Sequence, residues 1–344
     1  MHGLIELQKK LYPDLLDVMQ QRYIILQNIE LLEPIGRRAL ADNTNLTERH
    51  IRGEVNVLSK QGLVGMTSKG MQLTKEGKLV IDQLASFMHE AMGLSVLEKQ
   101  LKETLQVNDV SIVPGNSDEQ EWVKQEMGKT CVSFLQENMP SHETIAVTGG
   151  STMAAVAKMM TPLSEKKDCL FVPARGGIGE KEENQANTIA AKMARQAHGN
   201  YRLLYVPDPL SENSYRTMIK EPAVMEILNL IKAADCVLHG IGDAITMAKR
   251  RKTSADILRK LEEEQAVSEA FGYYFNASGD IVHKVRTIGI HLDDLSERKQ
   301  QVITVAGGNS KAQAITSYFK RGKSDLLITD EAAAKKILRD NHSL

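Results

Sequence analysis

The sequence is poor in cysteine and lacks any motif in which cysteine would bind a metal. Its 344 residues include three cysteines, Cys131, Cys169 and Cys236, which lie far apart and form no CxxC pair. No histidine lies at metal-ligand spacing from them, so we predict neither a metal site nor a disulfide framework. We expect three reduced, mostly buried thiols in a cytosolic protein that needs no cofactor.

Long apolar runs and a strong net charge are also missing. No apolar run approaches the ~18 residues needed to span a bilayer, and the first six residues, MHGLIE, do not resemble a signal peptide. We therefore expect a cytoplasmic protein with no membrane partner. The formal net charge is only −1, so a signal for nucleic-acid binding must come from local clustering of charge.

The chain is longer than one domain usually is. Its hydrophobic content of 42% and charged content of 25% are those of a globular protein, and its length favours two or three domains. We expect an N-terminal domain at 1–85 and a linking helix at 86–108, from a helical pattern that runs from about 80 to 108. This helix either forms a dimer or packs on its own domain. A larger domain follows at 109–344.

The larger domain has an α/β pattern. Short β-type runs alternate with helical stretches, which predicts βαβ units and a mainly parallel, Rossmann-like doubly wound sheet with helices on both faces. The expected strands are 111–113, 144–147, 169–172, 202–206, 236–239, 286–290, 302–305 and 326–329.

The N-terminal domain has the pattern of a winged helix-turn-helix. A short helix at 35–41 and turn residues at 43–45 precede a second helix, which runs from Glu48 to about Gln61 with Thr47 as its N-cap. Gly62 ends that helix, and two short runs, 63–66 and 71–73, predict a hairpin with a basic tip. In such a motif the second helix enters the major groove of DNA.

The local charge supports DNA binding. Residues 35–79 hold eight Lys or Arg residues against four Asp or Glu residues, in a chain that is otherwise acidic. The alternative is a protein–protein module whose charges form a solvated face. The residues expected to touch operator DNA are Arg37, Arg38, Thr47, Arg49, His50, Arg52 and Lys69.

Four glycine-centred motifs each follow a predicted strand, and the carboxyl ends of parallel strands meet at one edge of a sheet. The first, at 145–152, joins a strand to a helix through Gly149, Gly150, Ser151 and Thr152. Its backbone can approach an anion closely at the start of the helix, although it lacks the GK[ST] of a nucleotide P-loop. The alternative is an ordinary tight turn.

The other three motifs supply side chains for the same edge. Arg175 ends the strand of the second motif, 171–179, and can fork onto a phosphate, while Gln185 in the next helix can bond sugar hydroxyls. The third, 237–244, leads to the basic cluster 249–252, whose Arg250 either reaches a second phosphate or lies on a solvated helix face. Glu269 can accept hydroxyl protons. Lys311, in the fourth motif, is either a phosphate-binding or a surface lysine.

These motifs occur together in a known family. The GGST turn, the GIGD strand end at 240–243 and the VxGGxxKA turn at 305–312 resemble the sugar-phosphate isomerase and deaminase fold. With the winged helix in front, and with VPARGG at 172–177 and ENQANT at 183–188, nearly the whole chain resembles the SorC family of bacterial sugar-binding transcriptional regulators.

The resemblance implies a repressor of a glycolytic operon that is released by fructose 1,6-bisphosphate. It also implies a homo-oligomer, a dimer or a tetramer, on paired operator sites. The effector contacts that it carries onto this chain are Gly149, Gly150, Ser151, Thr152, Arg175, Gln185, Arg250, Glu269 and Lys311.

The main alternative is a sugar-phosphate isomerase or deaminase with an accessory winged-helix domain. Deaminases of this fold carry Asp-Gly-His after the strand end, where this chain reads Asp243-Ala244-Ile245. The acid/base histidine is therefore missing, although His239 or Glu269 remains a candidate base. We predict no catalytic residue. A constitutive architectural DNA binder is a third possibility, but it would not need four polar glycine turns.

Overall fold

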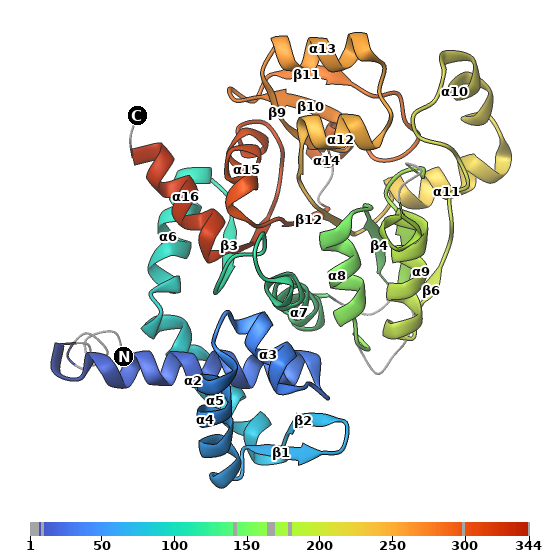
Figure 1. Cartoon of the computed structure of the whole chain (residues 1–344). Coiled ribbons are helices and arrows are strands. Elements are labelled where there is room, and N and C mark those ends of the chain that lie inside the picture. Colours follow the sequence, from blue (N-terminus) through green and yellow to red (C-terminus); the bar gives the residue numbers. More distant parts are fainter. Residues whose placement is uncertain are drawn as a thin grey trace. The chain divides into compact units, whose positions relative to one another are not determined.

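The protein divides into two compact units. A computed structural model describes residue 7 and residues 10–139, 143–163, 169–177, 181–297 and 300–342. The first unit comprises residues 1–97 and 119–123, and the second comprises residues 98–118 and 124–344 (Figure 1). Among the described residues, no helix is both long enough and apolar enough to cross a membrane.

The first unit is a winged helix-turn-helix. Its helices are α2 (Pro13–Leu32), α3 (Arg37–Thr44), α4 (Glu48–Lys60) and α5 (Lys75–Ala91), and its antiparallel hairpin consists of β1 (Val64–Thr67) and β2 (Gly70–Leu73). On α4, Ile51, Val55 and Leu58 are at most 1% exposed and join the core of this unit, as their helical spacing predicts. The predicted motif is thus confirmed.

The caps of α4 also follow the prediction. The hydroxyl of Thr47 accepts a hydrogen bond of 3.3 Å from the backbone N–H of His50. After the helix, Gly62 has a φ of 75°, a left-handed conformation that suits glycine. The start and end of α4 therefore rest on the two residues that the sequence indicates.

The first predicted helix, 35–41, is wrong by a few residues. Ile35 instead pairs with Met71 of the hairpin, through backbone N–O distances of 3.1 and 2.8 Å in the two directions. Asn43 and Thr44, expected in a turn, donate side-chain hydrogen bonds to carbonyls one turn back in α3. These bonds extend the helix, which ends at Asn45 in the left-handed conformation.

The helix expected from about 80 to 108 is interrupted. Helix α5 ends at Ala91, and α6 (Leu94–Leu105) begins three residues later. Between them Gly93 has a φ of 73°, which no residue inside an α-helix adopts. The apolar spacing therefore continues through two helices rather than one.

The second unit contains a seven-stranded parallel sheet in the order β3-β13-β12-β7-β4-β5-β6. Its strands are β3 (Asp109–Val113), β4 (Thr144–Val147), β5 (Leu170–Pro173), β6 (Asn200–Tyr201), β7 (Cys236–His239), β12 (Gln301–Val305) and β13 (Leu326–Asp330). From β4 the chain first adds β5 and β6 on one side, and then β7, β12 and β13 on the other. Because such crossovers are right-handed, the connecting helices cover both faces, as a doubly wound sheet requires.

The helices of this unit connect its strands along the chain, except the last helix, which follows the final strand. They are α7 (Glu121–Asn138), α8 (Ser151–Met159), η1 (Glu182–Asn184), α9 (Ala186–Ala197), α10 (Glu212–Met218), α11 (Pro222–Lys232), α12 (Ala244–Arg250), α13 (Ala255–Glu263), α14 (Leu292–Glu297), η2 (Asn309–Lys311), α15 (Ala312–Phe319) and α16 (Glu331–His342).

A second, antiparallel sheet was not predicted. It has the order β11-β10-β9-β8, with β8 (Gly242–Asp243), β9 (Ala266–Ala270), β10 (Tyr273–Asn276) and β11 (Ile281–Lys284). Figure 1 shows α12 and α13 beside its strands, in orange. This sheet lies between β7 and β12 in the sequence and brings β9 to the pocket described below.

Two predicted strands are wrong. The run 202–206 leaves the sheet after β6, and the run 286–290 makes only an isolated bridge, between Gly289 and Arg175. Both have β-type composition, but neither lies beside a partner over several residues. A strand needs such a partner, which composition does not show.

Candidate functional site

A pocket lies at the carboxyl ends of β4 and β7, where the order of the parallel strands reverses. This is the position at which open α/β sheets bind ligands. The pocket encloses about 770 Å³ of empty space, part of it open to solvent. All nine residues that the sequence indicated for effector binding line it: Gly149, Gly150, Ser151, Thr152, Arg175, Gln185, Arg250, Glu269 and Lys311.

The GGST turn needs both of its glycines. A Cβ atom on residue 149 would lie 2.7 Å from the carbonyl oxygen of Asn184, closer than real Cβ contacts occur. Gly150, the N-cap of α8, has a φ of 118°, which side chains rarely adopt. Its N–H donates a hydrogen bond of 2.9 Å to Asn184, which ties the turn to the segment before α9.

Two helices begin at the pocket wall. Residues 150–153, which cap and open α8, line it, and so do Gln185 and Ala186, the N-cap and first residue of α9. The backbone N–H groups in the first turn of a helix have no partner within the helix and attract anions. The wall thus offers two positions for a negatively charged group.

The lining carries an excess of positive charge. It includes four cationic side chains, Arg175, Arg250, Arg251 and Lys311, against one carboxylate, Glu269. Burial, together with the nearby Lys124 and Arg250, lowers the pKa of Lys311, although Asp118 opposes this. A cation whose pKa is lowered by neighbouring cations lies where an anion would be stabilised.

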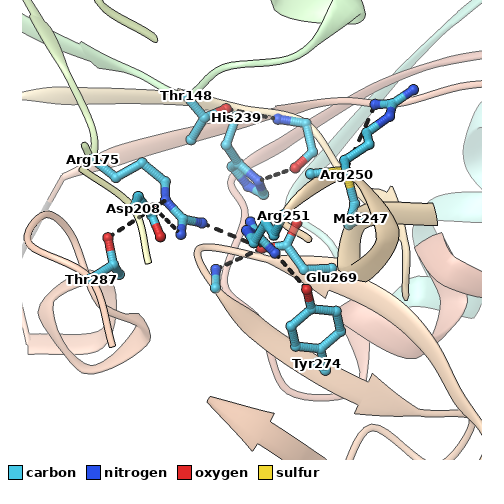
Figure 2. A network of polar contacts seen from close by, with 12 residues as sticks. Thr148, Arg175, Asp208, His239, Met247, Arg250, Arg251, Glu269, Tyr274 and Thr287 are labelled. Atoms are coloured by element: carbon cyan, nitrogen blue, oxygen red, sulfur yellow. Dashed lines mark hydrogen bonds and ion pairs between the residues drawn. The ribbon is translucent and has the colours of Figure 1, made fainter. Parts of the chain in front are cut away.

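Arg175, Arg251 and Glu269 form a buried network (Figure 2). Glu269 Oε1 accepts hydrogen bonds of 2.7 Å from Arg251 Nη2, 2.7 Å from the backbone N–H of Gly272 and 3.4 Å from Arg175 Nη1. Arg251 Nη1 also donates to the hydroxyl of Tyr274, at 2.8 Å. All three hydrogen bonds to Glu269 are accepted by the same carboxylate oxygen, Oε1.

Arg175 extends this network toward a third acid. Its Nε donates a hydrogen bond of 2.7 Å to Asp208 Oδ2, which also accepts one of 3.1 Å from Thr287 Oγ1. Arg175 is 4% exposed, and its guanidinium group already binds the carboxylates of Asp208 and Glu269. The side chain therefore forms part of the pocket wall, and its guanidinium group is not free to bind a phosphate with two nitrogens. Sequence reasoning missed Arg251, Asp208 and Thr287, although it noted the basic cluster that contains Arg251.

Arg250 is the last residue of α12 and Arg251 is its C-cap, but the two side chains differ in exposure. The side chain of Arg250 is exposed, and Nη1 approaches Met247 Sδ at 3.8 Å, while Arg251 is buried. Arg250 is therefore solvated, as expected for a residue on an exposed helix face, and it also lines the pocket, as a phosphate-binding residue would.

The groups that an isomerase or deaminase would use are engaged otherwise. Asp243 is the N-cap of α12 and accepts a hydrogen bond of 2.8 Å from the N–H of Thr246. Ile245, at the position of the missing histidine, packs against an apolar cluster. Burial raises the pKa of Glu269, but Arg251 and Arg175 outweigh it and hold this pKa below its ordinary value. Glu269 is therefore a poor proton acceptor at neutral pH.

His239, the other candidate base, is fully buried at the end of β7. Its Nε2 lies 2.7 Å from Thr304 Oγ1 and its Nδ1 lies 3.1 Å from the carbonyl oxygen of Gly240. Burial lowers its pKa to about 4. Both ring nitrogens thus have partners inside the protein, and the imidazole is a structural element behind the pocket.

The predicted DNA contacts lie on the first unit. Arg49 and Arg52 are exposed on α4, opposite its buried stripe, and Lys69 is exposed at the tip of the hairpin. Arg38 is exposed on α3, whereas Arg37 is half-buried. The structure therefore presents a helix and a hairpin tip with basic side chains that solvent can reach.

Three of the predicted contacts have partners within the unit. His50 Nε2 lies 3.1 Å from Gln21 Oε1 on α2, and Thr47 caps α4. Arg52 Nη2 lies 3.8 Å from Glu48 Oε1, one turn earlier, in an exposed pair that is worth little energy. Arg22, which is not among the predicted contacts, binds Glu54 at 2.7 Å and so joins α2 to α4.

The cysteines are buried thiols. Cys131, Cys169 and Cys236 are all free and buried. Burial raises the pKa of Cys131 to about 12. In the part of the chain that the structure describes, no group of three or more His, Cys, Asp or Glu side chains is placed to hold a metal ion.

Two family models match the two parts of the chain. The "CggR N-terminal DNA binding domain" matches residues 18–88, and the "Putative sugar-binding domain" matches residues 89–339. The latter alone covers more than half of the chain.

Relatives match over the full length. The chain is 52% identical over 340 residues to the central glycolytic genes regulator of Bacillus subtilis, which covers 99% of this chain and 100% of the relative. It is 54% identical over 341 residues to the regulator of the same name from Priestia megaterium, covering 99% of each. These relatives regulate transcription and are not enzymes.

A solved structure agrees. A SorC family transcriptional regulator from Enterococcus faecalis superimposes with a TM-score of 0.67 at 46% identity, over 70% of this chain and 99% of that one. Its extent is close to that of the larger, sugar-binding unit. The chain therefore belongs to the SorC family of sugar-binding transcriptional regulators and is a homologue of the central glycolytic genes regulators.

Proposed function

We propose that this regulator is a cytoplasmic repressor of a glycolytic operon and that fructose 1,6-bisphosphate releases it from DNA. The observation that carries the proposal is the pocket, in which two helix N-termini and four cationic side chains surround one space. A bisphosphate needs two anion positions, and this arrangement supplies more than one. Its full-length relatives are named for the regulation of glycolytic genes.

The nine lining residues take the following roles in this proposal. Gly149, Gly150, Ser151 and Thr152 bind one phosphate at the start of α8 through backbone and hydroxyl donors. Arg250 and Lys311 bind the other. Gln185 and Glu269 bond the sugar hydroxyls, and Arg175 contributes positive charge from the wall.

On the DNA side, α4 enters the major groove and the hairpin tip touches the backbone. The contacts that we propose are Arg37, Arg38, Thr47, Arg49, His50, Arg52 and Lys69. The protein acts as a dimer or a tetramer on paired operator sites, with residues 1–85 as the DNA-binding domain, 86–108 as the linking segment and 109–344 as the effector domain.

The mechanism is allosteric. Sugar phosphate in the pocket changes the arrangement of the protomers and lowers the affinity or cooperativity of DNA binding. Linkage then requires that operator DNA weaken the binding of the sugar by the same factor, typically ~5–150-fold for such couplings. Equal affinity of free and operator-bound protein for the sugar would contradict the mechanism.

The first experiment is a thermal-shift titration of the purified protein. The four probes are fructose 1,6-bisphosphate, glucose 6-phosphate, fructose 6-phosphate and ribose 5-phosphate. A ligand at about 100 times its Kd stabilises the folded state by about 2.7 kcal/mol, which raises the melting temperature measurably. We expect the largest shift with the bisphosphate. A larger shift with a monophosphate would reassign the effector, and no shift with any of them would contradict the pocket assignment.

A further inference from the structure

The second unit contains another cavity, which the proposed function does not use. It is lined by Tyr215 of α10 and by five residues that follow or end β11: Lys284, Val285, Arg286, Thr287 and His291. It encloses about 530 Å³ of empty space, part of it open to solvent. None of these residues lines the effector pocket. The two cavities are therefore separate.

The cavity is rich in cationic side chains. Lys284 and Arg286 are exposed, and the Nζ atom of Lys284 lies 4.7 Å from the centre of the Tyr273 ring. Arg286 Nη2 lies 2.6 Å from Glu212 Oε2, a carboxylate that Arg216 also binds, at 2.6 Å. One glutamate is thus shared by two arginines, and Lys284 contributes a further positive charge.

The charged groups around His291 are also mainly positive. Burial and the nearby Lys284 lower the pKa of His291, with smaller effects of Lys232 and Arg175 in the same direction. Asp294 opposes them, but Lys232 lies 3.5 Å from this carboxylate. The wall therefore places the imidazole among cations that disfavour its protonated form, and a bound anion would favour that form.

Two buried polar atoms near this wall have no hydrogen-bond partner among the described residues. One is Nδ1 of His291, which lines the cavity, and the other is the hydroxyl oxygen of Tyr273, which does not line it and belongs to a residue that is 4% exposed. The rings of these two residues meet edge to face, with centroids 6.3 Å apart. Buried polar atoms are normally satisfied, so the unpartnered Nδ1 of His291 in the wall of a cationic cavity indicates a ligand.

Hydrogen bonds between side chains link the wall of this cavity to the wall of the effector pocket. Thr287 lines the second cavity and binds Asp208, and Asp208 binds Arg175, which lines the first (Figure 2). A single hydrogen-bonded chain of three buried side chains thus runs from one wall to the other. A ligand at the second cavity would contact an element that also shapes the effector pocket.

We propose that this cavity is a second anion site, which binds the phosphate group of a small metabolite through Lys284, Arg286 and His291. The phosphate takes charge-assisted hydrogen bonds from the lysine and the arginine. His291 donates a hydrogen bond from its ring. This site is independent of the identity of the effector in the first pocket.

The test uses inorganic phosphate as the probe and the full-length protein labelled at histidine. The ring signals of His291, assigned by their loss in His291→Gln, are followed by NMR during a phosphate titration at constant ionic strength. We expect a saturable shift and a rise in the pKa of His291. In the double variant Lys284→Gln/Arg286→Gln, phosphate should bind at least roughly tenfold more weakly, because two charge-assisted bonds are lost.

The matched control is Lys220→Gln, which removes an exposed lysine that lines neither cavity. It should titrate as the unaltered protein does. Lys284 and Arg286 are exposed, so the double variant should fold, which its melting curve verifies. His291 signals that do not respond to phosphate, or that respond equally in the double variant, would overturn the proposal. The result does not depend on which sugar phosphate binds the first pocket.

Discussion

Arg251 and Glu269 form a hydrogen-bonded ion pair of 2.7 Å inside the second unit, where neither residue is more than 5% exposed. Arg175 approaches the same carboxylate oxygen at 3.4 Å. Removal of one partner from a buried pair leaves an uncompensated charge, which typically costs about 3–5 kcal/mol. We expect Glu269→Gln to lower the free energy of unfolding by an amount in this range, measured by urea denaturation.

The control for this change is Glu264→Gln. Glu264 pairs with Lys260 at 3.7 Å on the surface, where both side chains are half exposed, so its loss should cost less than about 1 kcal/mol. The pKa of Glu269 is lowered in the folded state, so its contribution is present above the ordinary value of 4.5 and is lost as the pH falls. Equal destabilisation by the two variants at pH 7 would contradict the importance of the buried network.

His239 should make the stability depend on pH. Its folded pKa of about 4 lies below the ordinary value of 6.5, so the unfolded chain binds the proton more readily in this window. Stability is then complete above pH 6.5 and falls with acidification, by about 2 kcal/mol at pH 5 from this group alone. In His239→Gln, the difference in unfolding free energy between pH 7 and pH 5 should shrink by that amount. An unchanged difference would mean that His239 is not neutral in the folded protein.

Asp243 should matter for stability and not for ligand binding. Its carboxylate caps α12 and its residue does not line the pocket. Asp243→Ala should lower the free energy of unfolding by about 0.5–2 kcal/mol, as the loss of an N-cap does. The affinity for fructose 1,6-bisphosphate, measured by calorimetry, should stay within about twofold. A loss of affinity much greater than twofold in a variant that is still folded would indicate that Asp243 contacts the ligand.

The basic residues of α4 should set the salt dependence of DNA binding. Arg49→Ala removes one exposed cation, so the slope of log K against log salt should fall by about one unit if Arg49 contacts a phosphate. The measurement is a titration of glycolytic promoter DNA at several salt concentrations. Arg259→Ala, which removes an exposed cation of α13, should leave the slope unchanged. An equal change in both variants would indicate a general effect of charge.

The sequence predicts the elements that depend on contacts between residues close together in the chain. It also predicts features that follow from a general rule of parallel sheets. The bounds of β4 and β7 agree with the predicted 144–147 and 236–239, because these strands are short apolar runs that end in glycine turns. The winged helix follows from local caps and periodicity. The carboxyl ends of parallel strands meet at one edge, and that rule accounts for the GGST turn, Arg175 and Lys311 at the pocket. Glu269 instead reaches the pocket from β9 of the antiparallel sheet.

What the sequence does not predict depends on partners that are far apart in the chain. Arg175 pairs with Asp208, 33 positions away, and with Glu269, 94 positions away. No spacing within a helix or strand relates such residues. Which of Arg250 and Arg251 is buried is decided by where the end of α12 packs and not by the four consecutive cations. The antiparallel sheet was missed because β9, β10 and β11 follow one another through short turns, and the alternation of strands and helices from which the parallel sheet was predicted does not indicate such a sheet.

The order of the parallel sheet also determines when the sugar-binding unit can be completed during synthesis. Strand β3, the first of the sheet, lies at its edge and pairs, among the described residues, with β13 alone, the last strand to emerge from the ribosome. Closing so long a segment carries an entropic cost that only the finished sheet repays. A nascent chain that stalls before residue 326 would therefore expose an unpaired strand that is prone to aggregate, while the residues of the winged helix, whose contacts are local, are already able to fold.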